Sequence, residues 1–111
     1  MASQISLKWN NYNSNFNNEM KLFLTQGDFV DVTIECEGRY LKAHKVVLSA
    51  CSPYFQKLIK ENPLKDPIIK LNDVSFSDME NVIHYMYNGE INLAQNHLTS
   101  FLRTAKLLKI K

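Results

Sequence analysis

The chain is poor in the residues that interrupt or cross-link a fold. Its 111 residues include three glycines, three prolines and two cysteines. With so few breakers, no repeat and no low-complexity tract, we expect one domain without an internal linker. Two cysteines cannot make a disulfide framework. Cys36 and Cys51 form no CxxC motif, which predicts reduced thiols in an intracellular protein.

Long apolar runs and a strong charge of one sign are also missing. No apolar run approaches the ~20 residues needed to span a bilayer, and the first four residues lack the basic and apolar regions of a secretory signal. The formal net charge is only +2, too small to imply a polyanionic partner. We therefore expect no membrane partner and no direct contact with nucleic acid.

Sequence motifs of catalysis are absent as well. The chain has no GxGxxG, GxxxxGK[ST], GxSxG or HExxH pattern. Cys36, His44 and Cys51 are the one group of soft metal ligands in a single region, but their spacing matches no zinc pattern. The prediction is a protein that is not an enzyme and holds no cofactor or metal.

What the sequence does contain is clear alternation of apolar and polar residues. Residues 30–36 and 39–43 alternate on either side of Glu37-Gly38, which predicts a β-hairpin. Residues 67–71 predict a strand that begins at a proline. Residues 5–9 predict a short strand without a local hairpin partner, and residues 90–92 predict one more strand.

Helical periodicity fills the remaining segments. One helix is expected to follow residues 10–15 and to stop at Gln26-Gly27-Asp28, and another to start at Ser52-Pro53 and end at Asn62-Pro63. A longer helix should begin with Ser75 and Asp78 at capping-box spacing and end at Asn88-Gly89. The apolar side of the last helix is predicted to consist of Leu98, Phe101, Leu102, Ala105 and Leu108. The fold class is α+β, a small sheet packed among helices.

The predicted hairpin also brings two opposite charges together. Asp31 opens its first strand and Lys45 follows its second, so both lie at the same end. The alternatives are two solvated side chains, the usual fate of such residues, and a partly buried pair, which is the arrangement that we expect.

Several blocks of the sequence resemble a known family. They are Leu7-Lys8-Trp9-Asn10-Asn11-Tyr12, Asp31-Val32-Thr33-Ile34, the long block from Leu41 to Phe55, and Tyr85-Met86-Tyr87-Asn88-Gly89-Glu90-Ile91. Together they resemble the BTB (POZ) domains of the insect Tramtrack group over nearly the whole chain. Two positions depart from the group pattern, which usually has an aromatic residue at Ile5 and an arginine at Lys8.

The resemblance implies a protein interaction module that forms homodimers and larger multimers, up to hexamers, of a nuclear transcription or chromatin regulator. Residues 1–11 would be a strand exchanged between subunits and residues 12–111 the core of one BTB domain. DNA recognition would belong to a domain beyond Lys111. The implied charged pocket is Asp31 with Lys45, and the expected interface consists of Ile5, Leu7, Trp9, Asn10, Asn11, Phe16, Met20, Glu90, Ile91 and Asn92.

The expected partners are a second copy of the chain, related BTB domains, and corepressor or architectural proteins. The alternative is a substrate adaptor for a cullin-3 ubiquitin ligase, which other BTB families provide. Such adaptors carry an apolar-x-Glu signal, and Leu64-Lys65-Asp66 matches it poorly.

Overall fold

A three-stranded sheet forms the base of the molecule. The computed structural model describes residues 3–111, so the first two residues of the expected exchanged segment lie outside it. The strands are β1 (Val32–Cys36), β2 (Arg39–Ala43) and β3 (Ile68–Leu71), in the order β2-β1-β3. β1 pairs with β2 antiparallel and with β3 parallel.

The predicted hairpin is confirmed, and its turn explains its register. Glu37 and Gly38 have φ values of 53° and 75°. Two consecutive residues with positive φ suit the tight turn that matches the twist of hairpin strands. The register places Ile34 opposite both Leu41 and Ile69.

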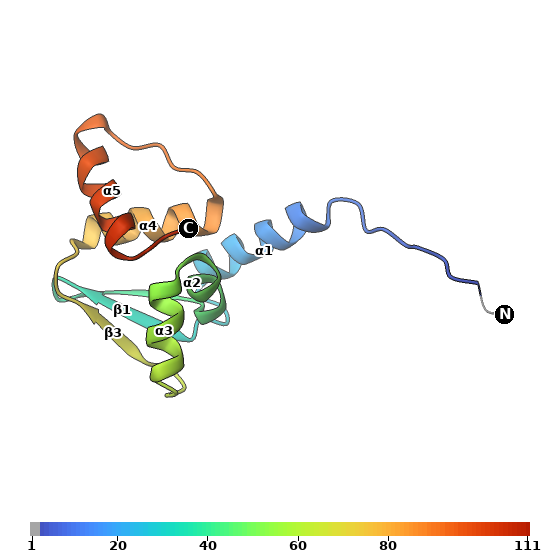
Figure 1. Cartoon of the computed structure of the whole chain (residues 1–111), viewed down its shortest axis with the longest axis horizontal. Coiled ribbons are helices and arrows are strands. Elements are labelled where there is room, and N and C mark those ends of the chain that lie inside the picture. The colour runs from blue at the N-terminus through green and yellow to red at the C-terminus, as the bar shows by residue number, and fades with distance from the viewer. Residues whose placement is uncertain (1–2) are drawn as a thin grey trace.

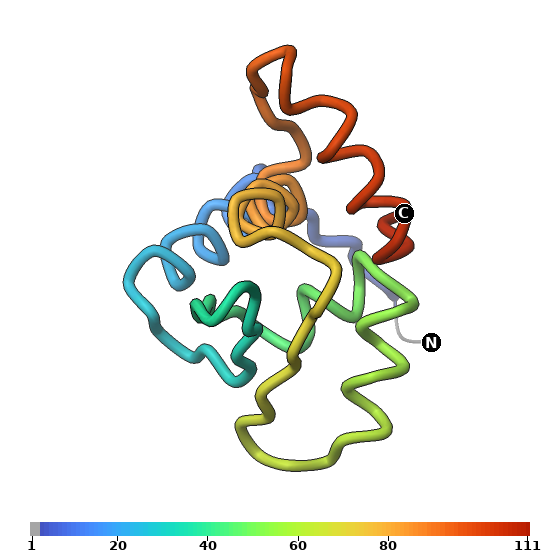
Figure 2. The backbone as a smooth tube through the Cα atoms, turned by 90° about the vertical axis from the view of Figure 1, so that its left-hand side faces the viewer, coloured from blue at the N-terminus to red at the C-terminus, as the bar shows by residue number. Residues whose placement is uncertain are grey.

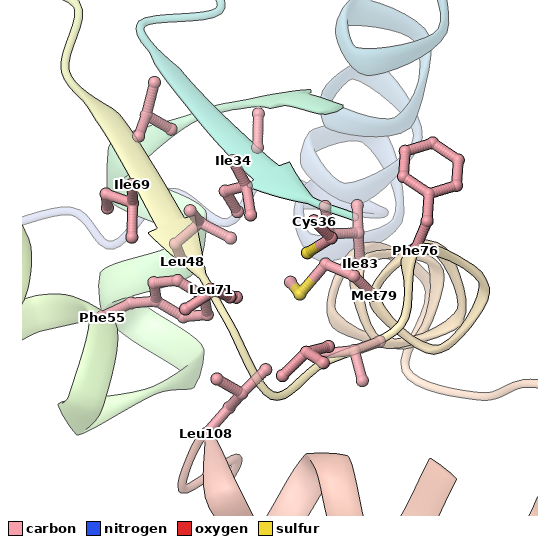
Figure 3. Close-up of a cluster of buried hydrophobic side chains, with 14 of the residues drawn as sticks. Ile34, Cys36, Leu48, Phe55, Ile69, Leu71, Phe76, Met79, Ile83 and Leu108 are labelled. Atoms are coloured by element: carbon pink, nitrogen blue, oxygen red, sulfur yellow. The ribbon is translucent and has the colours of Figure 1, made fainter. Parts of the chain in front are cut away.

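One face of the sheet carries the core. Because side chains alternate across a strand, Val32, Ile34 and Cys36 all point inward, where each is almost completely buried. In Figure 3 the sheet residues Ile34, Ile69 and Leu71 face Leu48 and Phe55 from the helices. The opposite face carries exposed residues such as Tyr40 and Lys70.

Two helices connect β2 to β3 and cover the core. They are α2 (Lys45–Cys51) and α3 (Pro53–Glu61). Ser52 lies between them, where its Oγ accepts a hydrogen bond from Phe55 N at 3.1 Å and donates one to Leu108 O at 2.6 Å. The predicted start at Ser52-Pro53 is confirmed, and α2 is an additional helix.

Helix α4 (Phe76–Asn88) lies at the centre of the molecule, between the sheet and α5, as the end-on view in Figure 2 shows. Its start is stabilised twice: Ser75 Oγ accepts from Asp78 N at 3.1 Å, and Glu37 Oε1 from the hairpin turn accepts from Phe76 N at 2.7 Å. The capping box is only half realised, because the Asp78 carboxylate turns away and accepts hydrogen bonds from Ser100 and Thr104 of α5.

The predicted apolar side of the last helix is partly wrong. A single 3₁₀ turn, η1 (Gln95–His97), leads into α5 (Leu98–Leu107). Phe101 and Leu108 are buried as expected, but Leu98 and Leu102 are exposed. The buried side includes Thr104 instead, because its hydroxyl has the Asp78 carboxylate as a partner.

Helix α1 (Tyr12–Gln26) joins the body only through its second half. It packs against α4 and ends at Gly27, which has a φ of 72°. We call residues 3–10 the arm. The arm and the first half of α1 extend away from the body (Figure 1). The radius of gyration is 16.6 Å, against about 13 Å for a compact domain of this length.

Candidate functional site

The arm presents large apolar side chains to solvent. Ile5, Leu7 and Trp9 are 84%, 92% and 64% exposed. Trp9 packs on Tyr12 with ring centroids 5.1 Å apart, and Tyr12 lies 6.4 Å from Phe16. We call Ile5, Leu7, Trp9, Tyr12 and Phe16 the arm surface.

A surface of this kind indicates an interaction site, because monomeric proteins rarely expose contiguous apolar patches. Met20, one turn further along α1, is half-buried and packs against the core. The arm surface therefore continues from the core outward along one helix. Asn10 and Asn11 are both exposed, and Asn11 adopts a left-handed conformation, with φ at 64°, where the arm turns into α1.

The arm is not paired with any strand. Within residues 3–111, its backbone makes no hydrogen bond to another part of the chain. An extended segment with unpaired N–H and C=O groups is a template for pairing with another chain. Residues 5–9 therefore do not form the predicted strand in the single chain, because no strand of the described chain pairs with them.

A second unpaired segment follows α4. The strand predicted over residues 90–92 is wrong for the isolated chain: Glu90, Ile91 and Asn92 belong to no helix or strand. In the described part of the chain their backbone groups have no backbone partner either. We call residues 90–93 the acceptor segment.

Side chains of the acceptor segment still alternate. Ile91 and Leu93 are half-buried, while Glu90 and Asn92 are exposed. The segment borders a groove of about 570 Å³ against α5, whose lining residues are Ile91, Asn92, Leu93, Gln95, Leu98 and Phe101. The structure does not bring the arm to this groove within one chain, because the arm points away from the body (Figure 1).

Asp31 and Lys45 do meet, but not as the expected pair of charges. Asp31 Oδ1 accepts a hydrogen bond from the backbone N–H of Lys45 at 2.7 Å, at the first residue of α2. The Lys45 ammonium points elsewhere and donates to Leu64 O at 2.9 Å. The physical reason is local: the first N–H groups of a helix lack intrahelical partners, and a carboxylate satisfies one of them. The pocket is a helix cap with a lysine beside it.

Sequence reasoning missed a buried polar cluster around His44. Its Nδ1 lies 2.7 Å from the Tyr87 hydroxyl and its Nε2 lies 2.8 Å from Asp28 O. His44 is 4% exposed. The signal available in the sequence was the position of His44 directly after Ala43, the last residue of the predicted hairpin.

Neither cysteine is a candidate nucleophile. Burial raises the pKa of Cys36 to about 11, and the nearby Glu37 and Glu35 carboxylates add to the effect. Burial also raises the pKa of Cys51, although Lys111 opposes the shift. Since the thiolate is the reactive form, these shifts make both cysteines poorer nucleophiles than an ordinary thiol. Among residues 3–111 no three metal-ligating side chains cluster, and no helix there is long and apolar enough to cross a membrane.

Comparison with known proteins decides the family. A family model described as the BTB/POZ domain matches residues 20–111. This chain belongs to the BTB/POZ family. The matched region begins within α1, so the arm precedes it.

Relatives of this BTB domain include three proteins of Drosophila melanogaster. Bric-a-brac 2 is 51% identical over 110 residues, 99% of this chain and 10% of the relative. The tramtrack alpha isoform is 50% identical over 112 residues, 100% of this chain and 14% of the relative. The longitudinals lacking protein-like relative is 48% identical over 108 residues, 97% of this chain and 85% of the relative. The resemblance to the Tramtrack group is confirmed, and in tramtrack it includes the arm.

Solved structures confirm the α+β fold. The BTB domain of zebrafish PATZ1 has a TM-score of 0.84 at 19% identity, covering 96% of this chain and 88% of that one. The BTB domain of human gigaxonin has a TM-score of 0.82 at 21% identity, covering 98% and 90%. A BTB domain is a protein interaction module and not an enzyme family. The chain spans about a tenth of bric-a-brac 2 and a seventh of tramtrack.

Proposed function

We propose that this BTB domain multimerises a nuclear transcription or chromatin regulator by adding its arm to the acceptor segment of a second copy. One observation carries the proposal: the same chain holds two unpaired, alternating segments that do not meet each other. Strand addition would supply the missing backbone hydrogen bonds of both at once. Two copies could exchange arms symmetrically, so that each segment of each chain finds a partner.

Burial of the arm surface supplies the driving force. Ile5, Leu7 and Trp9 are largely exposed in the single chain. Full burial of a side chain of this size contributes roughly 1.5 to 3 kcal/mol. Ordering the backbone of a short segment costs about 1 to 2 kcal/mol per residue. Burial of three such side chains on each arm outweighs this cost only when contacts of helix α1 contribute as well. Phe16 and Met20 on α1 would provide them.

The wider role follows from the relatives. The Tramtrack-group resemblance supports a nuclear regulator in which this module brings copies together, with related BTB domains and corepressor or architectural proteins as further partners. Larger assemblies, up to hexamers, would form by association of such dimers. Immunofluorescence of the protein in its own cells is expected to show a nuclear signal, and a purely cytoplasmic signal would contradict this role.

The mass in solution tests the assembly. Light scattering of the 111-residue chain is expected to give a dimer or a larger multimer. Deletion of residues 1–11 and Trp9→Ala should each lower the mass or make the chain aggregate. Ile68→Ala is the matched control, because Ile68 is an exposed apolar residue on the outer face of β3. An unchanged multimer with unchanged solubility in both arm variants would rule out the arm as the intersubunit element.

A further inference from the structure

Alternation restricts how the arm can pair with the acceptor segment. In the arm, Ile5, Leu7 and Trp9 share one side and Ser6 and Lys8 the other. In the acceptor segment the half-buried Ile91 and Leu93 share one side. Since a shift by one residue would turn the apolar side chains to solvent, Leu7 must stand opposite Ile91 or Leu93. Registers that place an arm residue opposite Tyr87 are excluded, because Tyr87 belongs to helix α4 and cannot pair with a strand.

One antiparallel register satisfies every position. With Leu7 opposite Ile91, Ile5 stands opposite Leu93 and Ser6 opposite Asn92. Trp9 then lies over Gly89, the left-handed residue that ends α4, which has no side chain and open space beside it. Lys8 meets Glu90.

The remaining registers fit less well. Antiparallel pairing with Leu7 opposite Leu93 sets Ile5 against Gln95, which belongs to η1. Parallel pairing with Leu7 opposite Ile91 sets Ile5 against Gly89 and Lys8 against Asn92. Parallel pairing with Leu7 opposite Leu93 sets Trp9 against Gln95 of η1 and Lys8 against Ala94. In all three, Lys8 and Glu90 face no opposite charge. These two are the sole Lys, Arg, Asp or Glu residues of positions 3–10 and 89–97, so charge complementarity selects the first register.

We propose that Lys8 of one subunit pairs with Glu90 of the other, and that this ion pair fixes the register in which the arm is added to the acceptor segment of a second copy. The inference rests on the arm addition proposed above. Glu90 is exposed and makes no hydrogen bond or ion pair within residues 3–111, and Lys8 likewise has no such partner there. Both charges are therefore available.

Reversal of one charge measures the strength of the contact. Opposite charges placed directly across a strand pair are mildly stabilising, and like charges there are destabilising. A symmetric dimer contains the contact twice. Reversing one of the two charges is therefore expected to raise the dissociation constant of the dimer roughly five- to thirtyfold at low salt, and the effect should fade in about 1 M salt because the charges are exposed.

Charge exchange provides the test. Lys8→Glu and Glu90→Lys chains should each assemble weakly alone, since each homodimer holds two repulsive contacts. A mixture of the two should recover wild-type affinity, because Glu at position 8 meets Lys at position 90 and Lys8 meets Glu90. Lys57→Glu, an exposed charge reversal on α3, is the matched control. Dissociation constants would come from sedimentation of the 111-residue chains over a range of concentrations.

The outcomes separate the two proposals. If both reversals assemble like wild type while Trp9→Ala still dissociates, the ion pair is wrong and arm addition stands. If the single variants weaken but their mixture does not recover, Lys8 and Glu90 do not face each other and the register is wrong. If no arm variant changes the assembly, the arm addition itself fails.

Discussion

Tyr87 makes two hydrogen bonds to one residue, His44. The Tyr87 hydroxyl accepts from the His44 backbone N–H at 2.9 Å and lies 2.7 Å from His44 Nδ1. On the other side of the ring, Nε2 lies 2.8 Å from Asp28 O. A carbonyl can only accept, so Nε2 carries a proton; in the neutral imidazole Nδ1 then accepts and the Tyr87 O–H donates. The contact joins the end of α4, the start of α2 and the loop after α1.

Removal of the Tyr87 hydroxyl should therefore destabilise the domain. Tyr87→Phe leaves the buried His44 N–H and Nδ1 without a partner, and each unsatisfied group costs about 1 to 3 kcal/mol. Urea unfolding would measure the loss. Tyr85→Phe is the control, since Tyr85 packs edge-on against Phe101 and makes no side-chain hydrogen bond in the described residues. Equal midpoints for the two variants would show that the contact adds nothing to stability.

Stability should also fall in alkali through the same residue. Burial raises the pKa of Tyr87 to about 12, whereas an unfolded tyrosine has a pKa of about 10. As the pH rises from about 10 to 12 the unfolded chain loses this proton first, so the folded state binds more protons and becomes less stable. The loss reaches about 1 kcal/mol at about pH 11. Measured as the difference in unfolding free energy between about pH 9 and 11, this component should be missing in Tyr87→Phe; an equal drop in both proteins would contradict it.

The Asp31 contact predicts an order of effects that differs from a buried ion pair. Asp31→Ala removes the acceptor for Lys45 N and should cost about 0.5 to 2 kcal/mol, as loss of a helix cap does. Asp31→Asn keeps an oxygen and should lose only the charge at the helix start, roughly 0.3 to 1 kcal/mol. Lys45→Gln keeps the backbone N–H and should change little. Thermal melting of the three variants measures the order of these losses in stability. If Lys45→Gln destabilises the domain as much as Asp31→Ala, the buried ion pair is the correct interpretation.

Cullin-3 is expected not to bind this chain at low micromolar concentration. Leu64 is exposed, but Asp66 stands where the adaptor signal has glutamate, and Leu64 O is already engaged by Lys45 Nζ. Titration calorimetry with the cullin-3 N-terminal domain should show no saturating heat. A tight complex that is lost in Leu64→Ala would make the adaptor role the better reading.

Local patterns predicted the parts of the fold whose causes are local. The Glu37-Gly38 turn, the end of α1 at Gly27 and the start of α3 at Ser52-Pro53 each depend on residues adjacent in the chain, and all are confirmed. The fate of Asp78 was not predictable in this way, because its partners Ser100 and Thr104 lie more than twenty residues away. The buried face of α5 was misjudged for the same reason: Thr104 is inside because of a distant carboxylate.

For the proposed interface, the sequence predicted only a set of residues. Alternation identified residues 5–9 and 90–92 as strands, yet a strand needs a neighbour, and neither segment has one within the described chain. The expected set also left out Tyr12, which belongs to the arm surface, and Leu93, which belongs to the acceptor segment. Tyr12 stands four residues before Phe16, and Leu93 continues the alternation of Ile91, so both could have been added by extending the same periodicities.

The exposed arm is expected to affect the steady-state abundance of the protein. A subunit that has not found its partner presents Ile5, Leu7 and Trp9 on an unstructured backbone, the kind of segment that chaperones hold and proteases cut first. Assembly hides it. The half-life of each newly made chain should then depend on how many copies are already present. The abundance of the protein should therefore change more steeply than its rate of synthesis, because unassembled copies are degraded first.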